Sequence, residues 1–224
     1  PSLKSMYEIP YGDGFSRYRC FYLEGNAGPK YLQSKDSGNR LYIPSLTASI
    51  LSDPTKTLYF TEGEKKALKA CQENIPCIGL SGLWNWKIKD GGLIPDFDRI
   101  DLKGRTVFII PDNDYQKPNK HGYKKNLKQA VSQFADALIV RGAKVSIVEL
   151  PDGPEKGLDD YLNNHTDDSF LELLMTGVAL GMADRKSKTE RLIKLVLDEA
   201  ELFHDEDMKA YATIKKDGHR ETFT

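Results

Sequence analysis

Short runs of consecutive apolar residues alternate with amphipathic segments between residues 58 and 175, and this alternation restricts the fold more than any other feature. The runs at 58–60, 77–80 and 107–110 are continuous, which is typical of strands covered on both faces. Helical patterns follow the first and third of these runs, at residues 62–74 and 119–142, and a fourth strand pattern follows at residues 143–151. We therefore predict an α/β fold with a central, mostly parallel four-stranded sheet flanked by helices.

The composition along the chain indicates three parts. Residues 1–57, where turn residues separate short aromatic–polar stretches, predict a small β-rich N-terminal subdomain that precedes the sheet. Residues 58–180 carry the strand–helix alternation. Residues 181–224 combine a charged helical pattern with a hairpin pattern, so we expect a linker helix and the start of a further domain of a longer protein.

Charge and cysteine content exclude several classes of protein. With 32 basic and 33 acidic residues the chain has no overall positive field, so any nucleic-acid binding must come from local patches. Its 3 cysteines form no CxxC pair, which indicates reduced thiols rather than a zinc site. No run approaches the roughly 20 apolar residues of a membrane span, so we expect a cytoplasmic protein without a membrane partner.

Acidic residues follow three of the four predicted strands. Glu62 ends the first strand, Asp112 and Asp114 follow the third, and Asp159 comes shortly after the fourth. Ligands of parallel α/β sheets bind at the carboxyl ends of strands, where these side chains would meet. Carboxylates gathered at one edge repel one another unless a cation lies between them. The pattern therefore predicts a site for Mg²⁺ or Mn²⁺, hard ions that prefer oxygen ligands.

These motifs resemble the toprim domain of topoisomerases, primases and nucleases. The matching stretches are "FTEGEKKALKA", "VFIIPDND" and "VSIVELPDGPEKGLDDYL", in that order. The resemblance implies that Glu62 is the family's glutamate, either a metal ligand or a general base, and that Asp112 and Asp114 are its metal-binding pair. It leaves Asp159 as the surviving member of a later acidic motif.

Within that family the sequence is most similar to the bacterial (DnaG-like) primase catalytic core and to toprim-containing primase or replication proteins of plasmids and phages. The upstream stretch "GPKYLQS" resembles the primase segment that contributes basic contacts. Two positions depart from the primase pattern, because Lys66 and Gly157 stand where that pattern has aspartates.

Several basic residues are candidates for contacts with nucleic acid or nucleotide. Lys30 and Arg40 precede the sheet, and we expect them over its acidic edge. Lys65 and Lys66 lie in the first turn of a predicted helix, where the helix dipole disfavours cations and phosphate contact would explain them. Residues Lys117, Lys120 and Lys124 belong to a basic run after Asp114, which is either a phosphate-binding patch or a solvated helix face.

The resemblance implies a primase-like, metal-dependent nucleotidyltransferase of a mobile-element, plasmid or phage replication protein. It would synthesise primers on a single-stranded DNA template from nucleoside triphosphates. A helicase or ATPase module is expected in the same full-length chain or as a partner. Two alternatives stay open: a toprim nuclease that uses water as the attacking group, and a catalytically degenerate module that binds nucleic acid or a helicase.

Overall fold

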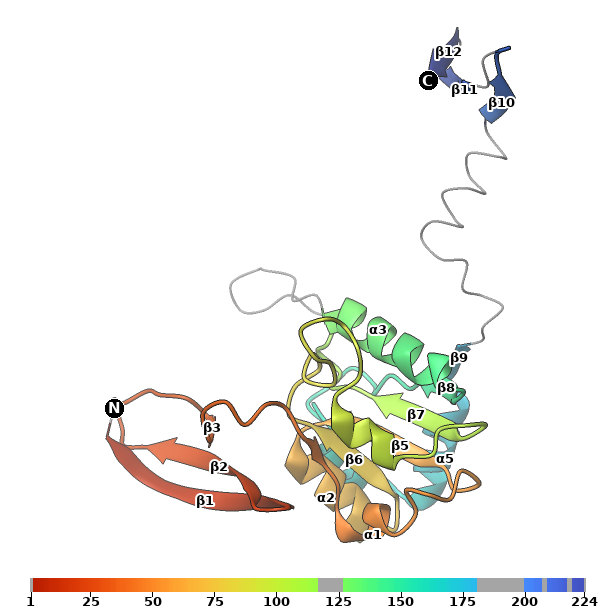
Figure 1. Cartoon of the computed structure of the whole chain (residues 1–224). Helices are drawn as coiled ribbons and strands as arrows, with labels where there is room; N and C mark the ends of the chain where they lie inside the picture. The colour runs from red at the N-terminus through yellow and green to blue at the C-terminus, as the bar shows by residue number, and fades with distance from the viewer. Residues whose placement is uncertain (1, 117–126, 181–199, 207–208, 217–218, 224) are drawn as a thin grey trace. The chain divides into compact units, whose positions relative to one another are not determined.

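The computed structural model describes residues 2–116, 127–180, 200–206, 209–216 and 219–223. The chain forms two compact units, one of residues 1–180 and one of residues 181–224 (Figure 1). The helical pattern predicted within 181–199 and the basic run at 117–126 lie outside the described residues. Our predicted boundary at residue 57, between a β-rich subdomain and the sheet, stays a prediction.

A six-stranded sheet forms the centre of the first unit. Its order is β4-β6-β5-β7-β8-β9, and the four inner strands run parallel, as the continuous apolar runs predicted. The short edge strands β4 and β9 are antiparallel to their neighbours, and we had not predicted their pairing. The strands are β4 (Leu41–Tyr42), β5 (Leu58–Glu62), β6 (Cys77–Leu80), β7 (Thr106–Ile110), β8 (Lys144–Ile147) and β9 (Val178–Leu180).

Helices cover both faces of this sheet (Figure 1). On one face α3 and the 3-10 helix η1 bury their apolar residues, and on the other α2, α4 and α5 do so. The connection from β4 to β5 contains the single-turn α1. The helices are α1 (Ser45–Ala48), α2 (Glu64–Gln72), η1 (Pro95–Arg99), α3 (Leu127–Val140), α4 (Leu158–Asn164) and α5 (Asp167–Met175).

Alternation along each strand divides the core into two layers. In β5, Leu58 and Phe60 belong to the layer under α3, while Tyr59 belongs to the layer under α2 and α5. The ring of Phe134 from α3 meets Phe60 edge-on with ring centroids 5.1 Å apart, and it also packs against Trp86 at 5.5 Å. The apolar stripe predicted for this helix is therefore its buried face.

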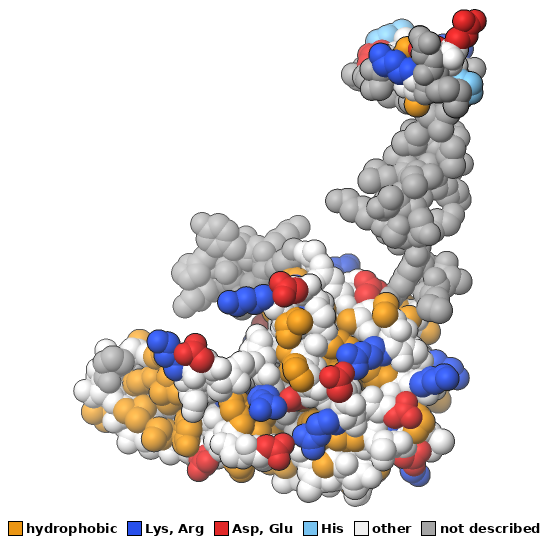
Figure 2. Space-filling view, viewed as in Figure 1, with side chains coloured by type: hydrophobic (Ala, Val, Ile, Leu, Met, Phe, Trp, Pro, Cys, Tyr) orange, Lys and Arg blue, Asp and Glu red, His pale blue; other side chains and the backbone are white. Residues whose placement is uncertain are grey.

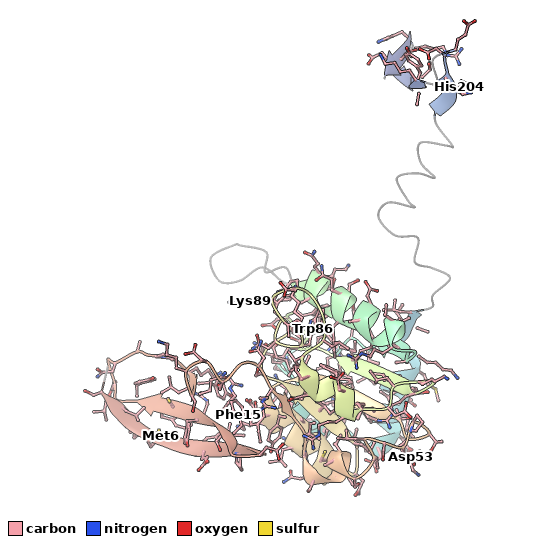
Figure 3. The ribbon with its side chains drawn as sticks, viewed as in Figure 1. Met6, Phe15, Asp53, Trp86, Lys89 and His204 are labelled. Carbon is pink, nitrogen blue, oxygen red and sulfur yellow. The ribbon has the colours of Figure 1, made fainter. Side chains whose placement is uncertain are left out.

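The N-terminal segment forms a separate antiparallel sheet of β1 (Leu3–Gly12), β2 (Phe15–Tyr22) and β3 (Tyr31–Gln33). Hydrophobic side chains gather on its surface in Figure 2, and Met6 is 54% exposed. Phe15 lies at the end of this sheet that is nearer the helices (Figure 3). There Tyr11 packs edge-on against both Phe15 and Tyr42, which connects the N-terminal sheet to strand β4.

A buried polar network strengthens the same connection. Glu64, in the first turn of α2, is only 3% exposed and accepts hydrogen bonds from the Tyr11 hydroxyl at 2.6 Å and from Arg17. The Arg17 guanidinium also lies over the Tyr31 ring, 4.9 Å from its centroid. A buried carboxylate is tolerated only when it is paired in this way. The network therefore connects the N-terminal sheet to the first turn of α2, which begins two residues after Glu62.

The second unit contains a three-stranded antiparallel sheet of β10 (Ala200–His204), β11 (Ala210–Lys216) and β12 (His219–Phe223). Lys216 pairs with His219 across the hairpin predicted at this position. Within the described parts of both units, none of the helices has the length and apolar character needed to cross a membrane.

We predict that Glu64→Ala lowers the free energy of unfolding by about 3–5 kcal/mol, since it leaves the buried Arg17 charge unpaired. The double variant Arg17→Met/Glu64→Ala should cost less than the sum of the two single changes, because neither charge is then left alone. Urea unfolding of the variants measures both quantities.

Lys69→Met is the matched control, because it removes an i,i+4 ion pair with Glu73 from the same helix. Such a pair on a helix surface contributes about 0.3–0.5 kcal/mol. Equal losses for Glu64→Ala and Lys69→Met would contradict the role given to the buried network.

Candidate functional site at the carboxyl edge of the sheet

The strand order brings two of the predicted acidic residues to adjacent strand ends. The chain leaves β5 towards β6 through α2 on one face, and it leaves β7 towards β8 through α3 on the other face. Such a reversal opens a crevice outside the carboxyl ends of the two strands. Glu62 is the last residue of β5, and Asp112 lies two residues beyond the end of β7. Both therefore face the position where α/β sheets bind ligands.

Gly63 makes the turn that places Glu62 at this edge. Its φ of +101° lies in a region that residues with a side chain rarely adopt, and its N–H donates to the Leu80 carbonyl at 2.7 Å. The chain can thus leave β5 and begin α2 at the next residue. This explains the abrupt glutamate–glycine end of the apolar run.

Two lysines occupy the space between the acids. The Lys66 ammonium lies 2.5 Å from Asp112 Oδ1 and donates to the Glu62 carbonyl oxygen at 3.0 Å. The Lys156 ammonium lies 2.9 Å from Asp114 Oδ2 and 3.9 Å from Asp112 Oδ2. We call Glu62, Asp112 and Asp114 the acidic cluster. In this structure Lys66 and Lys156 supply positive charge to the acidic cluster.

Burial and mutual repulsion act on the acidic cluster. Burial, followed by the charge of Asp112, raises the pKa of Glu62 above its ordinary value. Burial also raises the pKa of Asp112, although the neighbouring Lys66 opposes this shift. A hydrogen bond from Lys156 to Asp114 raises the pKa of the lysine. The acids are therefore coupled to one another and to both lysines.

The acidic cluster fits one hard divalent cation by its chemistry, because its donors are all carboxylate oxygens at a partly buried edge that holds excess negative charge. In this structure the ammonium groups of Lys66 and Lys156 lie between the carboxylates. Across the part of the chain that the structure describes, no three His, Cys, Asp or Glu side chains form a group ready to hold a metal ion. A cation at Asp112 and Asp114 would have to take the place of the Lys156 ammonium, whose side chain is 58% exposed.

Asn113, between the two aspartates, holds the loop that carries Lys156. Its side-chain amide donates to the carbonyls of Pro151, Gly153 and Glu155 at 3.1–3.2 Å. Its backbone N–H donates to the carbonyl of Lys156 at 2.9 Å. We did not predict a role for Asn113 or Lys156 from the sequence. The position of Asn113, a short polar residue between two aspartates, could have indicated it, whereas nothing comparable indicated Lys156.

The structure does not bring Asp159 into the ion pairs of the acidic cluster. This residue lies in the first turn of α4, and its side chain lines a depression with Lys65, Lys69 and Gln72. Lys65 and Lys66 thus point to different surroundings, although they are adjacent in the sequence. The predicted role of Asp159 as a metal ligand stays a prediction.

The predicted basic residues lie in several places. Lys30 lines a depression of the N-terminal sheet with Lys4 and Arg19. Arg40 pairs with Asp96 at 3.0 Å, and its guanidinium also lines a groove with Lys87 and Lys89. Among the described residues, no ion pair joins Lys30 or Arg40 to the acidic cluster. Three further candidates fall outside the described residues: Lys117, Lys120 and Lys124.

We predict that Glu62→Gln is more stable than the wild type at pH 7 in metal-free buffer. The raised pKa means that the folded chain holds this proton more tightly than the unfolded chain, whose glutamate titrates near pH ~4.3. The wild type therefore loses stability as the pH rises from below that value through the folded pKa, and the variant does not. Urea unfolding across a pH series measures the difference, which should vanish at low pH.

Glu172→Gln in α5 provides the control, since it removes an exposed carboxyl that is not part of the acidic cluster. A Glu62→Gln variant that is less stable than the wild type at pH 7 would contradict the electrostatic description of the edge.

We predict that Asn113→Ala increases amide exchange in residues 152–157 and lowers the free energy of unfolding by about 1–2 kcal/mol, because three side-chain hydrogen bonds to the loop are lost. Exchange measured by mass spectrometry reports on the loop directly. Asn163→Ala, an exposed substitution in α4, is the control. Unchanged exchange in Asn113→Ala would show that the loop does not depend on this residue.

Comparison with solved structures identifies the fold. The chain is similar to the E. coli primase catalytic core, with a TM-score of 0.52, 16% identity, and coverage of 86% of this chain and 62% of that one. The DnaG primase catalytic domain bound to ssDNA gives a TM-score of 0.52 at 17% identity, with coverage of 86% and 61%. The zinc-binding and RNA polymerase domains of the Aquifex aeolicus primase give 0.50 at 18% identity, with coverage of 82% and 42%. The chain thus spans 42–62% of these structures' lengths.

These similarities confirm the predicted toprim fold of the DnaG-like kind. No curated protein matches the sequence. A family model described as a domain of unknown function, DUF3854, matches residues 48–169, which include the acidic cluster and both lysines that pair with it. The chain is therefore a member of the DUF3854 family.

Proposed function

We propose that this chain is a primase-like nucleotidyltransferase domain that uses Mg²⁺ or Mn²⁺ to synthesise primers on single-stranded DNA from nucleoside triphosphates. One observation carries the proposal. Glu62, Asp112 and Asp114 lie at the reversal of strand order in a sheet that has the fold of primase catalytic cores. Fold alone does not determine activity, so the proposal rests on the chemistry of this edge.

Each member of the acidic cluster has a defined task in this proposal. Asp112 and Asp114 would hold the divalent cation in the place that the Lys156 ammonium occupies here. Glu62, whose pKa is raised by burial, would hold the cation from the adjacent strand or would accept the proton of the attacking 3′-hydroxyl. When bound, the cation supplies charge stabilisation to the triphosphate during in-line displacement.

Lys156 would then be available to the substrate. A lysine released from two aspartates carries its charge into a crevice where triphosphate oxygens would lie, and a lysine acts on phosphate as a point charge. The loop held by Asn113 keeps this side chain within reach of the edge. Exchange of Lys156 between the aspartates and the phosphates would couple metal binding to nucleotide binding.

Basic and aromatic residues outside the edge suit contact with a single strand. The depression of the N-terminal sheet combines Lys30 and Arg19 with Phe21, and the groove near Arg40 contains Lys89, labelled in Figure 3. Single-stranded DNA is bound by positive grooves with aromatic side chains on which bases stack. Lys65, Lys117, Lys120 and Lys124 are further candidates for phosphate contact.

The wider setting follows from the same resemblance. We propose that the domain works in the cytoplasm, in a replication protein of a plasmid, a phage or another mobile element. A helicase or ATPase module, in the same full-length protein or as a partner, would supply the unwound template.

A second candidate function is a module that binds nucleic acid or a helicase without catalysis. The observation that favours it is the Lys66–Asp112 ion pair, which neutralises one of the acids that the proposed chemistry needs. A toprim nuclease, which would use the same acids with water as the attacking group, is the remaining alternative.

We predict that the protein, incubated with single-stranded DNA, all four nucleoside triphosphates and Mn²⁺ or Mg²⁺, makes oligonucleotides. Asp112→Asn should lower the rate at least 100-fold, because the cation loses a charged ligand while the shape of the side chain is kept. Gel analysis of labelled products measures synthesis and strand cleavage in one experiment.

Asp168→Asn, an exposed change in α5, is the matched control and should keep the wild-type rate. Metal-dependent cleavage without synthesis would identify a nuclease. DNA binding without either reaction, unchanged in Asp112→Asn, would overturn the catalytic proposal and favour the binding module.

A further inference from the structure

Lys66 lies where a helix does not favour a lysine. It belongs to the first turn of α2, where the positive end of the helix dipole opposes a cation. Its ammonium contacts the Asp112 carboxylate at 2.5 Å and the Glu62 carbonyl at 3.0 Å, and its side chain is only 18% exposed. Helix stability does not explain this residue, whereas the charge at the edge of the sheet does.

Gly157 provides the space for the Lys66 side chain. A Cβ at this position would lie 2.3 Å from Lys66 Cε and 3.0 Å from Cδ, distances that atoms do not tolerate without displacement. The backbone of Gly157 has φ −128° and ψ 171°, an extended conformation open to any residue. A side chain at this position would not strain the backbone, but it would displace the end of the Lys66 side chain and press on Asp159 Oδ1, 3.0 Å away. Lys66 and Gly157 act as a complementary pair.

The two lysines at the edge differ in how firmly they are placed. Lys156 sits on a loop with its side chain 58% exposed, and it pairs with Asp112 and Asp114. Lys66 comes from a helix, is mostly buried, lies over Gly157 and has two oxygen partners. An incoming cation therefore meets a mostly exposed ammonium at Lys156 and a mostly buried one at Lys66, so we expect it to replace Lys156 first.

We propose that the Lys66 ammonium is a built-in cation that stands in for a metal ion at Asp112 Oδ1, so that the acidic cluster takes one divalent cation, on the side that Lys156 faces. This inference deepens the proposed function by assigning its metal requirement. It also makes a claim about cation binding alone, which can be tested whether or not the chain makes primers.

Titration of the metal-stripped protein with Mn²⁺ by isothermal calorimetry tests the proposal. We expect one Mn²⁺ per wild-type chain. Lys66→Met, which keeps much of the side-chain volume but removes the charge, should bind Mn²⁺ at least tenfold more tightly, about 1.4 kcal/mol, because a positive charge beside the ion has gone. Gly157→Ala, which keeps all charges but pushes Lys66 aside, should shift the affinity in the same direction.

Lys69→Met, one turn further along α2, is the control and should titrate like the wild type. Unchanged or weaker binding by Lys66→Met overturns the inference, as does a wild-type chain that binds two ions. If Lys66→Met fails to fold by circular dichroism, Gly157→Ala decides the question.

The two proposals fail separately. A wild type that synthesises primers while Lys66→Met shows unaltered Mn²⁺ binding overturns the role of Lys66 and leaves the proposed function standing. Tighter Mn²⁺ binding by Lys66→Met in a protein that makes no primers supports the role of Lys66 and overturns the proposed function.

Discussion

Acidic side chains at the C-terminal ends of parallel strands need a compensating positive charge. In this chain two lysines supply that charge, and their positions determine the geometry of the candidate site. Glu62 and Asp112 are brought together by the order of β5 and β7, which is fixed by burial of the apolar strands. Partial burial raises the pKa of both, so water alone compensates them poorly. Lys66 and Lys156 provide the charge from two different elements. The two lysines thus offset two of the three carboxylates, and the proposed ion would enter on the side that Lys156 faces.

The N-terminal sheet depends on the same region of α2. Glu64 binds Tyr11 and Arg17, and Lys66 two residues later pairs with Asp112, so the anchor of the N-terminal sheet and one partner of the acidic cluster share the first turn of α2. Gly63 lies between Glu62 and Glu64 and allows the two glutamates to serve different surroundings. A strand bound on the N-terminal sheet would therefore lie on an element that is tied directly to the helix of the proposed site. This connection would give the proposed binding surface and the proposed site a common support.

The sequence predicted the parallel strands and the buried face of α3 because burial leaves a periodic record in neighbouring residues. It also predicted that acids would meet at one edge, since strand direction alone places them there. Contacts between distant segments could not be predicted from such a pattern, because they join residues more than 35 positions apart. Examples are the ion pairs Lys66–Asp112 and Arg17–Glu64 and the hydrogen bonds from Asn113 to the loop of Lys156. Strands β4 and β9, of 2 and 3 residues, are too short for a pattern to reveal their pairing.

The central claim is that Lys156 yields to a divalent cation while Lys66 remains on Asp112. A crystal soaked in Mn²⁺ and measured at the manganese absorption edge tests it most directly, because anomalous density locates the ion independently of the protein atoms. The account predicts a single manganese peak against Asp112 and Asp114, with Lys156 turned away and the Lys66–Asp112 pair intact. Two manganese peaks, or one that replaces the Lys66 ammonium, would contradict it.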